Sequence, residues 1–498
     1  MSINPEFSKI QSYNTLMIKG ANGVECKLNL KEEEAKEVLS VEAVAYLSQA
    51  ECLTREIKYS GKVIFTVIYK SEGAIKKCEN AVEYSYRFAC EQALGGMPVM
   101  GFVRAENAQI NALNGIVTVS CVINFEGQLN KVYEEQYFSN DSSLFIKKKS
   151  VNSIKEICCV DKVFSIEDEF DFTTTVSEVL SHSEKAYLNS IKAGVGAVIA
   201  DGEIESTIVA LPLTEKEDFE VLTKKVPFRI ECPCDDTLPE KDVLGFVNVV
   251  NSNLKVYVDE GKNKSTISII VDVCLQARVL ESVEHLTIED AYSLKNHLVL
   301  EKSSQKTCNF LGFRCVEQSF KSEVLNKDDK NARLLCIFND KIEQIDYSLK
   351  NSLLEVNGVL SVTVLTKEEE VIKSQKALVP FEFSTKIEGD KVELIKCTLC
   401  NFSYKDGNPY VIEYTVKTSF GEFDECSSSV IVKVEEGALK KINNSAISVY
   451  IPSCGDSLWD VAKELGVDEQ TILKTNENLQ FPLCGDERIV IYRELNNK

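Results

Sequence analysis

The chain has 498 residues, a length that predicts three to four domains. It is 44% hydrophobic and 27% charged, the balance of an ordinary folded protein rather than a disordered one. The formal net charge of −21 argues against nucleic-acid binding, which depends on Lys and Arg neutralising phosphates, and against docking on anionic lipid. We therefore expect no nucleic-acid partner and no direct membrane insertion.

The first residues lack the basic and apolar regions of a secretory signal. The longest apolar stretches, such as Ala193–Ala200, are far shorter than the ~20 residues that span a bilayer. These features predict a cytosolic protein. In a reducing cytosol, the 18 cysteines are expected to be free thiols rather than disulfides.

One pattern occurs three times along the chain. A small polar residue and Gly precede a strand-like run, a charged hairpin follows, and a second run centres on an apolar–X–aromatic triplet. The copies span Ser60–Tyr84, Asp201–Phe228 and Asn357–Phe381, and their glycines are 141 and 156 residues apart. The polar–Gly pair fits a turn, because Gly takes positive φ without steric cost.

Each copy is flanked by further matching elements. Downstream, apolar residues alternate with less apolar ones, which predicts a half-buried strand. Upstream, apolar residues recur at helical spacing. The expected strands are 117–125, 267–275 and 410–420, and the expected helices are Lys31–Ala45, Thr173–Leu188 and Lys327–Asp340. The unit is thus predicted to be a mostly antiparallel β domain with a small helical element.

The repeat divides the chain into domains. The predicted limits are 1–140, 141–300 and 301–438 for the three repeats, 439–446 for a linker, and 447–494 for a different C-terminal domain. A shorter similarity supports the period, since the segment from Asn140 to Leu144 resembles the one from Glu289 to Leu294. The fold class is therefore mainly β, followed by one small α+β domain.

The last fifty residues read as strand, helix, helix and strand. Ile447–Ile451 and Arg488–Tyr492 have strand character. Ser457 and Asp460 form a capping-box pattern at the start of the first helix, which ends at Gly466. Asp468 is placed to cap the second helix.

This order, with the runs GDSLWDVAKELGV, DEQTILKTNENL and CGDERIVIY, resembles the LysM domain. The resemblance implies a shallow groove and an N-acetylglucosamine glycan ligand, such as peptidoglycan or chitin. Many glycan binders have Asn-Pro after the second helix, where this chain has Asn476-Glu477. By position, the groove residues are Gly455, Asp456, Ser457, Leu458 and Trp459 on one side, and Asn476, Glu477, Asn478 and Leu479 on the other.

Three β-rich repeats followed by one LysM domain resemble the SPOCS-domain (DUF3794) proteins of spore-forming clostridia. The residues that carry this resemblance are the strands beginning at Gly61, Gly202 and Gly358 and the triplets that follow them. The family implies a spore-coat morphogenetic adaptor in the mother cell. Its LysM domain would hold the coat-basement ATPase SpoIVA at the forespore surface, and its repeats would contact other coat proteins. The alternative is a cell-wall protein that binds peptidoglycan.

No pattern predicts an enzyme, a metal site or a cofactor. Cys397 and Cys400 form a lone CxxC without the second pair that zinc sites usually have. The histidines, at positions 182, 285 and 297, are isolated in sequence, and no phosphate-binding loop occurs. Trp459, the only tryptophan, is open to two interpretations: it packs the small C-terminal core, or it anchors a partner.

Overall fold

The computed structural model describes residues 3–213, 219–259, 264–325, 332–369, 371–440, 446–476 and 478–492. Strands account for 78% of the structure and helices for 4%, which confirms the mainly β prediction. The strands are long because apolar residues alternate along them. In the strand Glu56–Ser71, for example, Ile57, Tyr59, Val63, Phe65 and Val67 all point into one core and are fully buried.

The first repeat folds as two three-stranded antiparallel sheets. The sheets have the strand orders β1-β6-β5 and β2-β3-β4, and they face one another across an apolar core. A short 3₁₀ helix, Glu34–Glu37, precedes β2. The strands are β1 (Glu6–Leu28), β2 (Val38–Leu53), β3 (Glu56–Ser71), β4 (Ala74–Ala89), β5 (Val99–Leu113) and β6 (Ile116–Asn140).

The same strand order recurs twice. The second unit pairs its strands as β11-β12-β7 and β10-β9-β8, and the third as β13-β18-β17 and β14-β15-β16. The strands of the second unit are β7 (Phe145–Phe172), β8 (Val176–Gly194), β9 (Ala197–Pro212), β10 (Glu220–Pro233), β11 (Asp242–Asp259) and β12 (Lys264–Tyr292). Those of the third are β13 (Asn296–Glu323), β14 (Arg333–Lys350), β15 (Leu353–Glu368), β16 (Val371–Lys386), β17 (Lys391–Lys405) and β18 (Val411–Leu439).

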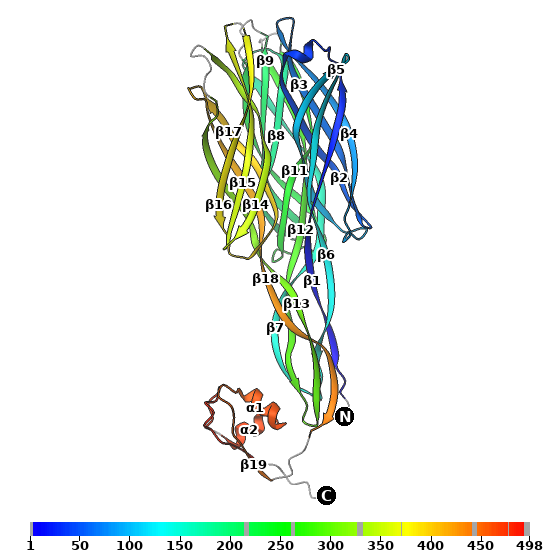
Figure 1. Cartoon of the computed structure of the whole chain (residues 1–498), viewed down its shortest axis with the longest axis vertical. Helices are drawn as coiled ribbons and strands as arrows, with labels where there is room; N and C mark the ends of the chain where they lie inside the picture. Colours follow the sequence, from blue (N-terminus) through cyan, green and yellow to red (C-terminus); the bar gives the residue numbers. More distant parts are fainter. Residues whose placement is uncertain are drawn as a thin grey trace.

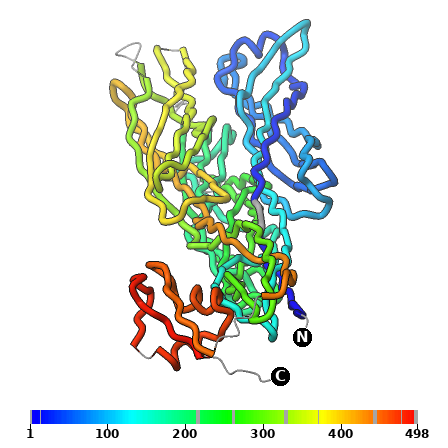
Figure 2. Tube along the Cα trace, turned by 60° about the horizontal axis from the view of Figure 1, so that its bottom comes forward, coloured from blue at the N-terminus to red at the C-terminus, as the bar shows by residue number. Residues whose placement is uncertain are grey.

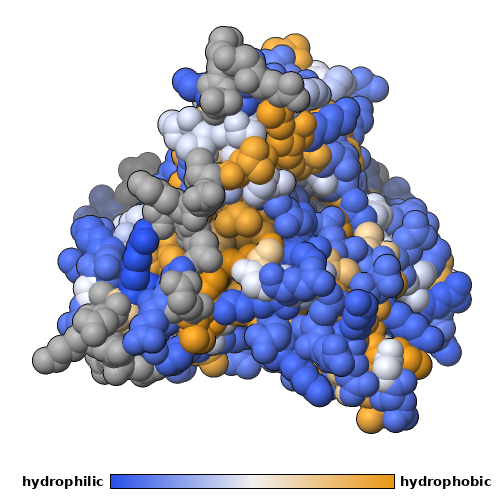
Figure 3. Space-filling view, turned by 90° about the horizontal axis from the view of Figure 1, so that it is seen from above, coloured by the Kyte–Doolittle hydropathy of each residue, from blue (hydrophilic) through white to orange (hydrophobic). Residues whose placement is uncertain are grey.

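The three units share one elongated molecule (Figure 1). The first and last strand of each unit pair over their whole length, and their far ends converge into a narrow stem below three sandwich-like heads. Side chains from all three pairs fill the stem, among them Phe138, Ile288 and Val434. Seen from above, the heads give a three-cornered outline with polar flanks and apolar side chains near its middle (Figure 3).

The glycine of each repeat is not in a turn, contrary to the sequence prediction. Gly61, Gly202 and Gly358 lie in the middle of β3, β9 and β15, directly opposite the aromatic residue of the following triplet. A Cβ on Gly202 would lie 2.4 Å from both the Phe228 ring and the carbonyl oxygen of Tyr187. Glycine is therefore required because an aromatic ring covers the backbone, a use of Gly typical of close packing in strands.

The predicted helices are also wrong. The segments Lys31–Ala45 and Thr173–Leu188 are mostly strand, as β2 and β8, apart from the 3₁₀ turn before β2. For Lys327–Asp340, residues 327–331 lie outside the described part of the chain, and β14 begins at Arg333. All three strands contain bulges, two of them in β8 between Val176 and Ser181. A bulge adds a residue to the two-residue alternation, so the apolar spacing resembles that of a helix.

The C-terminal module has the predicted order of elements. It consists of β19 (Ile447–Tyr450), α1 (Leu458–Leu465), α2 (Glu469–Thr475) and β20 (Ile489–Tyr492), with β19 and β20 paired antiparallel. The Ser457–Asp460 capping box is present, and Gly466 ends α1 in a left-handed conformation. Asp468 caps α2 by accepting a hydrogen bond from the Gln470 amide at 3.1 Å. Residues 441–445 of the predicted linker lie outside the described residues.

The domain limits can be placed on these strands. The limit at 140/141 falls between β6 and β7, whereas the one at 300/301 falls inside β13, which begins at Asn296. The polar composition around residue 301 belongs to a two-stranded segment of the stem, where one face of the ribbon meets solvent.

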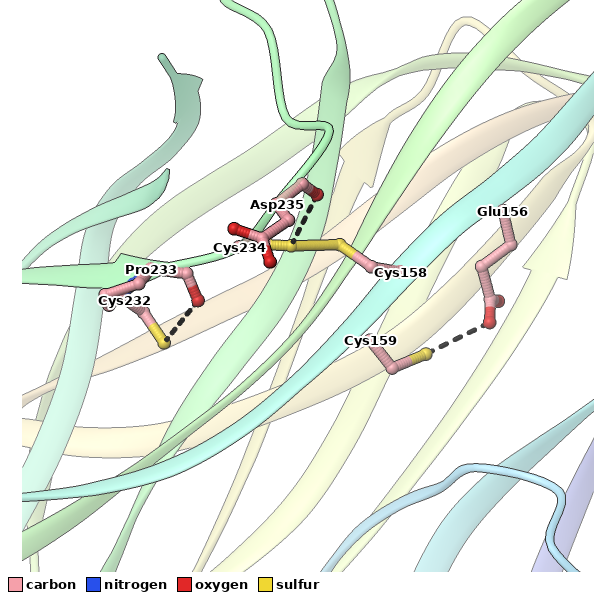
Figure 4. The surroundings of a disulfide bond; sticks show 7 residues. All are labelled: Glu156, Cys158, Cys159, Cys232, Pro233, Cys234 and Asp235. Atoms are coloured by element: carbon pink, nitrogen blue, oxygen red, sulfur yellow. Dashed lines mark hydrogen bonds between the residues drawn. A yellow bond between two sulfur atoms is a disulfide. The ribbon is translucent and has the colours of Figure 1, made fainter. Parts of the chain in front are cut away.

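Two cysteines are not free, which corrects the expectation of thiols throughout. Cys158 in β7 and Cys234, just after β10, form a disulfide across 76 residues of sequence (Figure 4). The two strands belong to the facing sheets of the second unit, so the fold brings together residues that are distant in sequence. The neighbouring Cys159 points away and its Sγ lies 3.0 Å from a carboxylate oxygen of Glu156. The other 16 cysteines are free.

Candidate functional site: the C-terminal module and its seat on the stem

The module lies beside the foot of the stem (Figure 2). It has its own small core, in which α1, α2 and β20 contribute Val461, Ala462, Ile472 and Ile489. Trp459 joins this core and is 9% exposed. The same cluster includes Tyr292 at the end of β12, so the core continues from the module into the second repeat. The module is therefore seated on the stem.

Asp290 of β12 is the polar centre of this seat. Its carboxylate accepts hydrogen bonds from the Trp459 indole nitrogen at 2.9 Å and from the Lys463 ammonium at 2.6 and 2.8 Å. Burial alone would raise the pKa of Asp290, but these two donors outweigh burial and hold its pKa below the usual value. Asp290 is thus ionised at neutral pH and links two residues of α1.

Tyr292 completes the seat. Its ring meets the Trp459 ring edge-on at 4.9 Å between centroids, a favourable aromatic geometry. Its hydroxyl donates to the carbonyl oxygen of Val467 at 2.9 Å. Trp459 therefore packs the module core, which is the first of the two interpretations, and its indole contacts Asp290 and Tyr292 of the same chain rather than a partner.

The first side of the predicted groove is tied to the opposite loop. The amide of Gly455 donates to the Leu483 carbonyl at 2.8 Å, and the Leu483 amide donates to the Asp456 carbonyl at 2.9 Å. The Asp456 carboxylate accepts from the Ser453 amide at 2.8 Å, and Ser457 is used in the capping box. These polar groups already have partners within the module.

The second side is likewise engaged. The Asn476 side chain donates to the carbonyl of Ile472 and exchanges two 2.8 Å hydrogen bonds with the backbone of Val490. Leu458 and Leu479, one from each side of the predicted groove, are partly buried and pack against the module core. Asn478 is exposed, whereas Glu477 lies outside the described residues.

A surface that the sequence reasoning missed lies on the other face of the β19–β20 ribbon. Ile447, Val449, Ile451 and Tyr492 point outward and are 57, 59, 68 and 58% exposed. Ile447 stands opposite Tyr492 in the strand pair. We call these four residues the outer ribbon face. The alternation of side chains in the two strands could have revealed this face, because Tyr450, Ile489 and Ile491 take the inner positions.

A short internal similarity in the sequence already pointed to Asp290, the centre of the seat. The segment around Asp290 resembles that around Asp141, and in the structure both aspartates serve at the foot of the stem. Asp141 accepts hydrogen bonds from the Asn4 amide at 2.7 Å and from the Ser143 amide at 2.8 Å. Asp290 occupies the corresponding place and receives the module instead. The repeat located the residue, but sequence alone gave no means of pairing it with Trp459.

Other candidate chemistry does not assemble into a site. The hydroxyl of Ser153 lies 2.9 Å from Nε2 of His285, yet within the described chain no carboxylate contacts the other ring nitrogen, and Ser153 is buried. Cys397 and Cys400 are free thiols on β17. Among the residues that the structure describes, no three of the types His, Cys, Asp and Glu are grouped so that they could hold a metal ion.

No described helix has the length and apolar character needed to cross a membrane. Comparison with known proteins gives no relative: no protein-family model matches the chain, and no curated protein or solved structure does so either. The resemblances to LysM and SPOCS domains therefore stay predictions.

Proposed function

We propose that this chain is a non-enzymatic adaptor of spore-coat assembly. In this proposal the C-terminal module recruits the chain to the coat-basement ATPase SpoIVA at the forespore surface, in the mother-cell cytosol. The three SPOCS-like repeats then provide surfaces for other coat proteins. The proposal combines the family resemblance with one observation about the module, its outer ribbon face.

The outer ribbon face supports a protein partner. An exposed strand face normally carries polar side chains, because water solvates them at no cost. Here Ile447, Val449, Ile451 and Tyr492 are all more than half exposed. Clustered apolar side chains on a surface are typical of protein–protein contacts. Aromatic residues such as Tyr492 are enriched in such contacts.

The polar residues predicted for the groove support a glycan less well. Sugar recognition needs free donors and acceptors, whereas Asp456 and Asn476 are hydrogen-bonded within the module. The seat also fixes which way the module faces. Because Trp459 and Lys463 of α1 face Asp290, α1 points toward the stem and the outer ribbon face remains available.

The test is capture of purified SpoIVA by the intact chain carrying Val449→Glu. The matched control is Val299→Glu, since Val299 is also an exposed valine, on β13 in the stem. We expect the Val449 variant to lose binding at least tenfold and the control to bind as the original chain does. Equal binding by both variants would contradict the proposed role of the module.

A pull-down on peptidoglycan distinguishes the proposed adaptor from the alternative, a wall-binding protein. Binding to peptidoglycan that is abolished by Asp456→Ala, together with no capture of SpoIVA, would replace the adaptor with a wall-binding protein. Unchanged emission of Trp459 in every variant would show that the module remains folded and seated.

A further inference from the structure

A partly open cavity of about 260 Å³ lies where the three heads meet. Two strands of each unit form its wall, and they are the same two in each case. These are the second and fifth strands of the repeat, β2 and β5, β8 and β11, and β14 and β17. The cavity therefore exists only when all three units are assembled, and it is a property of the whole chain.

The charged groups of the wall are mostly paired with one another. Lys185 of β8 forms an ion pair with Asp340 of β14. His182 lies 2.8 Å from Glu184, both in β8. Arg104 of β5 lies 2.5 Å from Glu126, which belongs to β6. These pairs account for much of the charge around the cavity without a ligand.

Lys396 of β17 differs from them. Its ammonium donates to the Asn248 side-chain oxygen at 2.7 Å and to the carbonyl of Val247, which are both neutral acceptors. No carboxylate of the described residues forms an ion pair with Lys396. The Phe246 ring lies 5.7 Å from the ammonium and offsets part of the cost of burying it. A buried ammonium without an ion pair is still costly, so this position favours an anion. The Nε of Arg104, another residue of the wall, is buried and has no hydrogen-bond partner within the described structure.

Apolar side chains complete the wall. Leu47, Phe102, Val249, Ile342 and Leu399 come from five of the six strands. A small inorganic anion would leave this apolar surface against water, whereas an organic anion would cover it. Ligand sites commonly combine such an apolar lining with a few fixed polar groups.

We infer that this cavity binds a small organic carboxylate, with the acidic group at Lys396 and the apolar body against Phe102 and Leu399. The charge-assisted hydrogen bond to the ammonium would be strong because it forms inside the protein, where the local dielectric is low. The inference concerns the three repeats and does not depend on the proposed role of the C-terminal module.

The affinity of the cavity for a carboxylate should depend on pH. Burial lowers the pKa of Lys396 to about 7, with Cys274 the main opposing group. The ammonium is present below that pH and is lost above it, so carboxylate affinity falls as pH rises through 7. The other titratable or charged groups of the wall are Glu42, Arg104, His182, Glu184, Lys185, Asp340, Lys341 and Cys397, and Lys417 shares a smaller adjoining pocket with Lys396.

The test uses benzoate as the carboxylate probe and benzyl alcohol as its uncharged counterpart, each titrated into the intact chain by calorimetry at constant ionic strength. We expect benzoate to bind at pH 6, benzyl alcohol to bind at least tenfold more weakly, and benzoate to bind at least tenfold more weakly at pH 8.5. Lys396→Met should abolish benzoate binding, whereas Lys321→Met, at a solvent-exposed site in β13, should leave it unchanged.

Measurements on the unmodified chain keep the inference falsifiable even if the Lys396 variant fails to fold. Absence of benzoate binding at pH 6, equal binding of benzyl alcohol, or equal binding of benzoate at both pH values would each overturn the inference. Inorganic phosphate serves as a third probe in the same calorimetric titration. Phosphate that binds more tightly than benzoate would overturn the assignment of an organic ligand.

Discussion

The guanidinium of Arg278 in β12 lies 3.5 Å from a carboxylate oxygen of Glu393 in β17, and both side chains are 1% exposed. Arg278 also binds Glu156 of its own unit at 2.8 Å. From the first unit, Gln128 and Thr15 donate to the two oxygens of Glu393 at 2.9 and 2.6 Å. One buried polar network therefore joins all three units where the heads meet the stem.

We predict that Arg278→Met lowers the free energy of unfolding by about 1.5–3 kcal/mol, because it removes one of the two positive partners of the buried Glu393 and leaves only Lys391, at 3.0 Å. Chemical denaturation of the two proteins measures the difference. The control is Arg229→Met, whose ion pairs with Asp201 and Glu231 are at the surface and should contribute less than about 1 kcal/mol. Similar effects of the two substitutions would contradict a structural role for the network.

The seat of the module can be followed with a native probe, because Trp459 is the only tryptophan. Asp290→Ala removes the acceptor of the Trp459 indole and of Lys463, so the module should detach from β12. We expect the fluorescence emission of Trp459 to shift to longer wavelength and hydrogen exchange in α1 to increase.

Glu289→Ala is the matched control for that experiment. Glu289 is adjacent in sequence but pairs at the surface with Lys147, at 3.2 Å. The Glu289→Ala variant should have the same Trp459 emission spectrum as the original chain. Acid gives a second check: since the seat holds the pKa of Asp290 below its usual value, this stabilisation is fully present at neutral pH and is lost in strong acid, as pH falls through the lowered pKa. An emission spectrum unchanged by Asp290→Ala would contradict this role of Asp290.

The covered glycines predict a third effect. Gly202→Ala places a methyl group 2.4 Å from the Phe228 ring and from the backbone of Tyr187, so we expect a loss of about 1–3 kcal/mol in the free energy of unfolding. Gly23→Ala, at a strand position with no heavy atom within 4 Å, should change it by less than about 0.5 kcal/mol. Thermal denaturation of both variants distinguishes the two outcomes.

The disulfide predicts a fourth effect. Cys234→Ser removes a link that closes 76 residues, and such a loss typically costs about 2–5 kcal/mol. Cys315→Ser, at a free cysteine, serves as the control. Thiol titration of the unfolded protein should find 16 free thiols without reductant and 18 after reduction. Eighteen thiols without reductant, in protein purified under air, would show that the link does not form.

Local patterns predicted the local structure well. Alternation located β3, β6 and their counterparts, and the Ser457–Asp460 and Asp468 signals located both helices of the module. The errors have a shared cause, since they depend on partners distant in sequence. A bulge is defined by the neighbouring strand, which is why β8 resembled a helix. Gly202 is explained only by Phe228 on the next strand.

The candidate site shows the same limit. Sequence placed Trp459, Asp456 and Asn476 in one module, and the structure keeps them there. The sequence alone could not show that Asn476 is hydrogen-bonded to Val490 of β20 or that Trp459 is hydrogen-bonded to Asp290. These contacts join residues that are 14 and 169 positions apart. Ile447, Val449 and Ile451, by contrast, alternate within one short strand, so a local pattern is enough to place them on one face.

The pairing of the first strand of each unit with the last has a consequence for biosynthesis. Glu6 pairs with Asn140, Phe145 with Tyr292, and Asn296 with Leu439, so each ribbon closes only after its whole unit has left the ribosome. Until then a long strand edge stays unpaired and open to wrong partners. Such distant pairings fold slowly. Successive closure during synthesis would therefore reduce exchange of strands between repeats, and refolding of the complete chain should be the less faithful route.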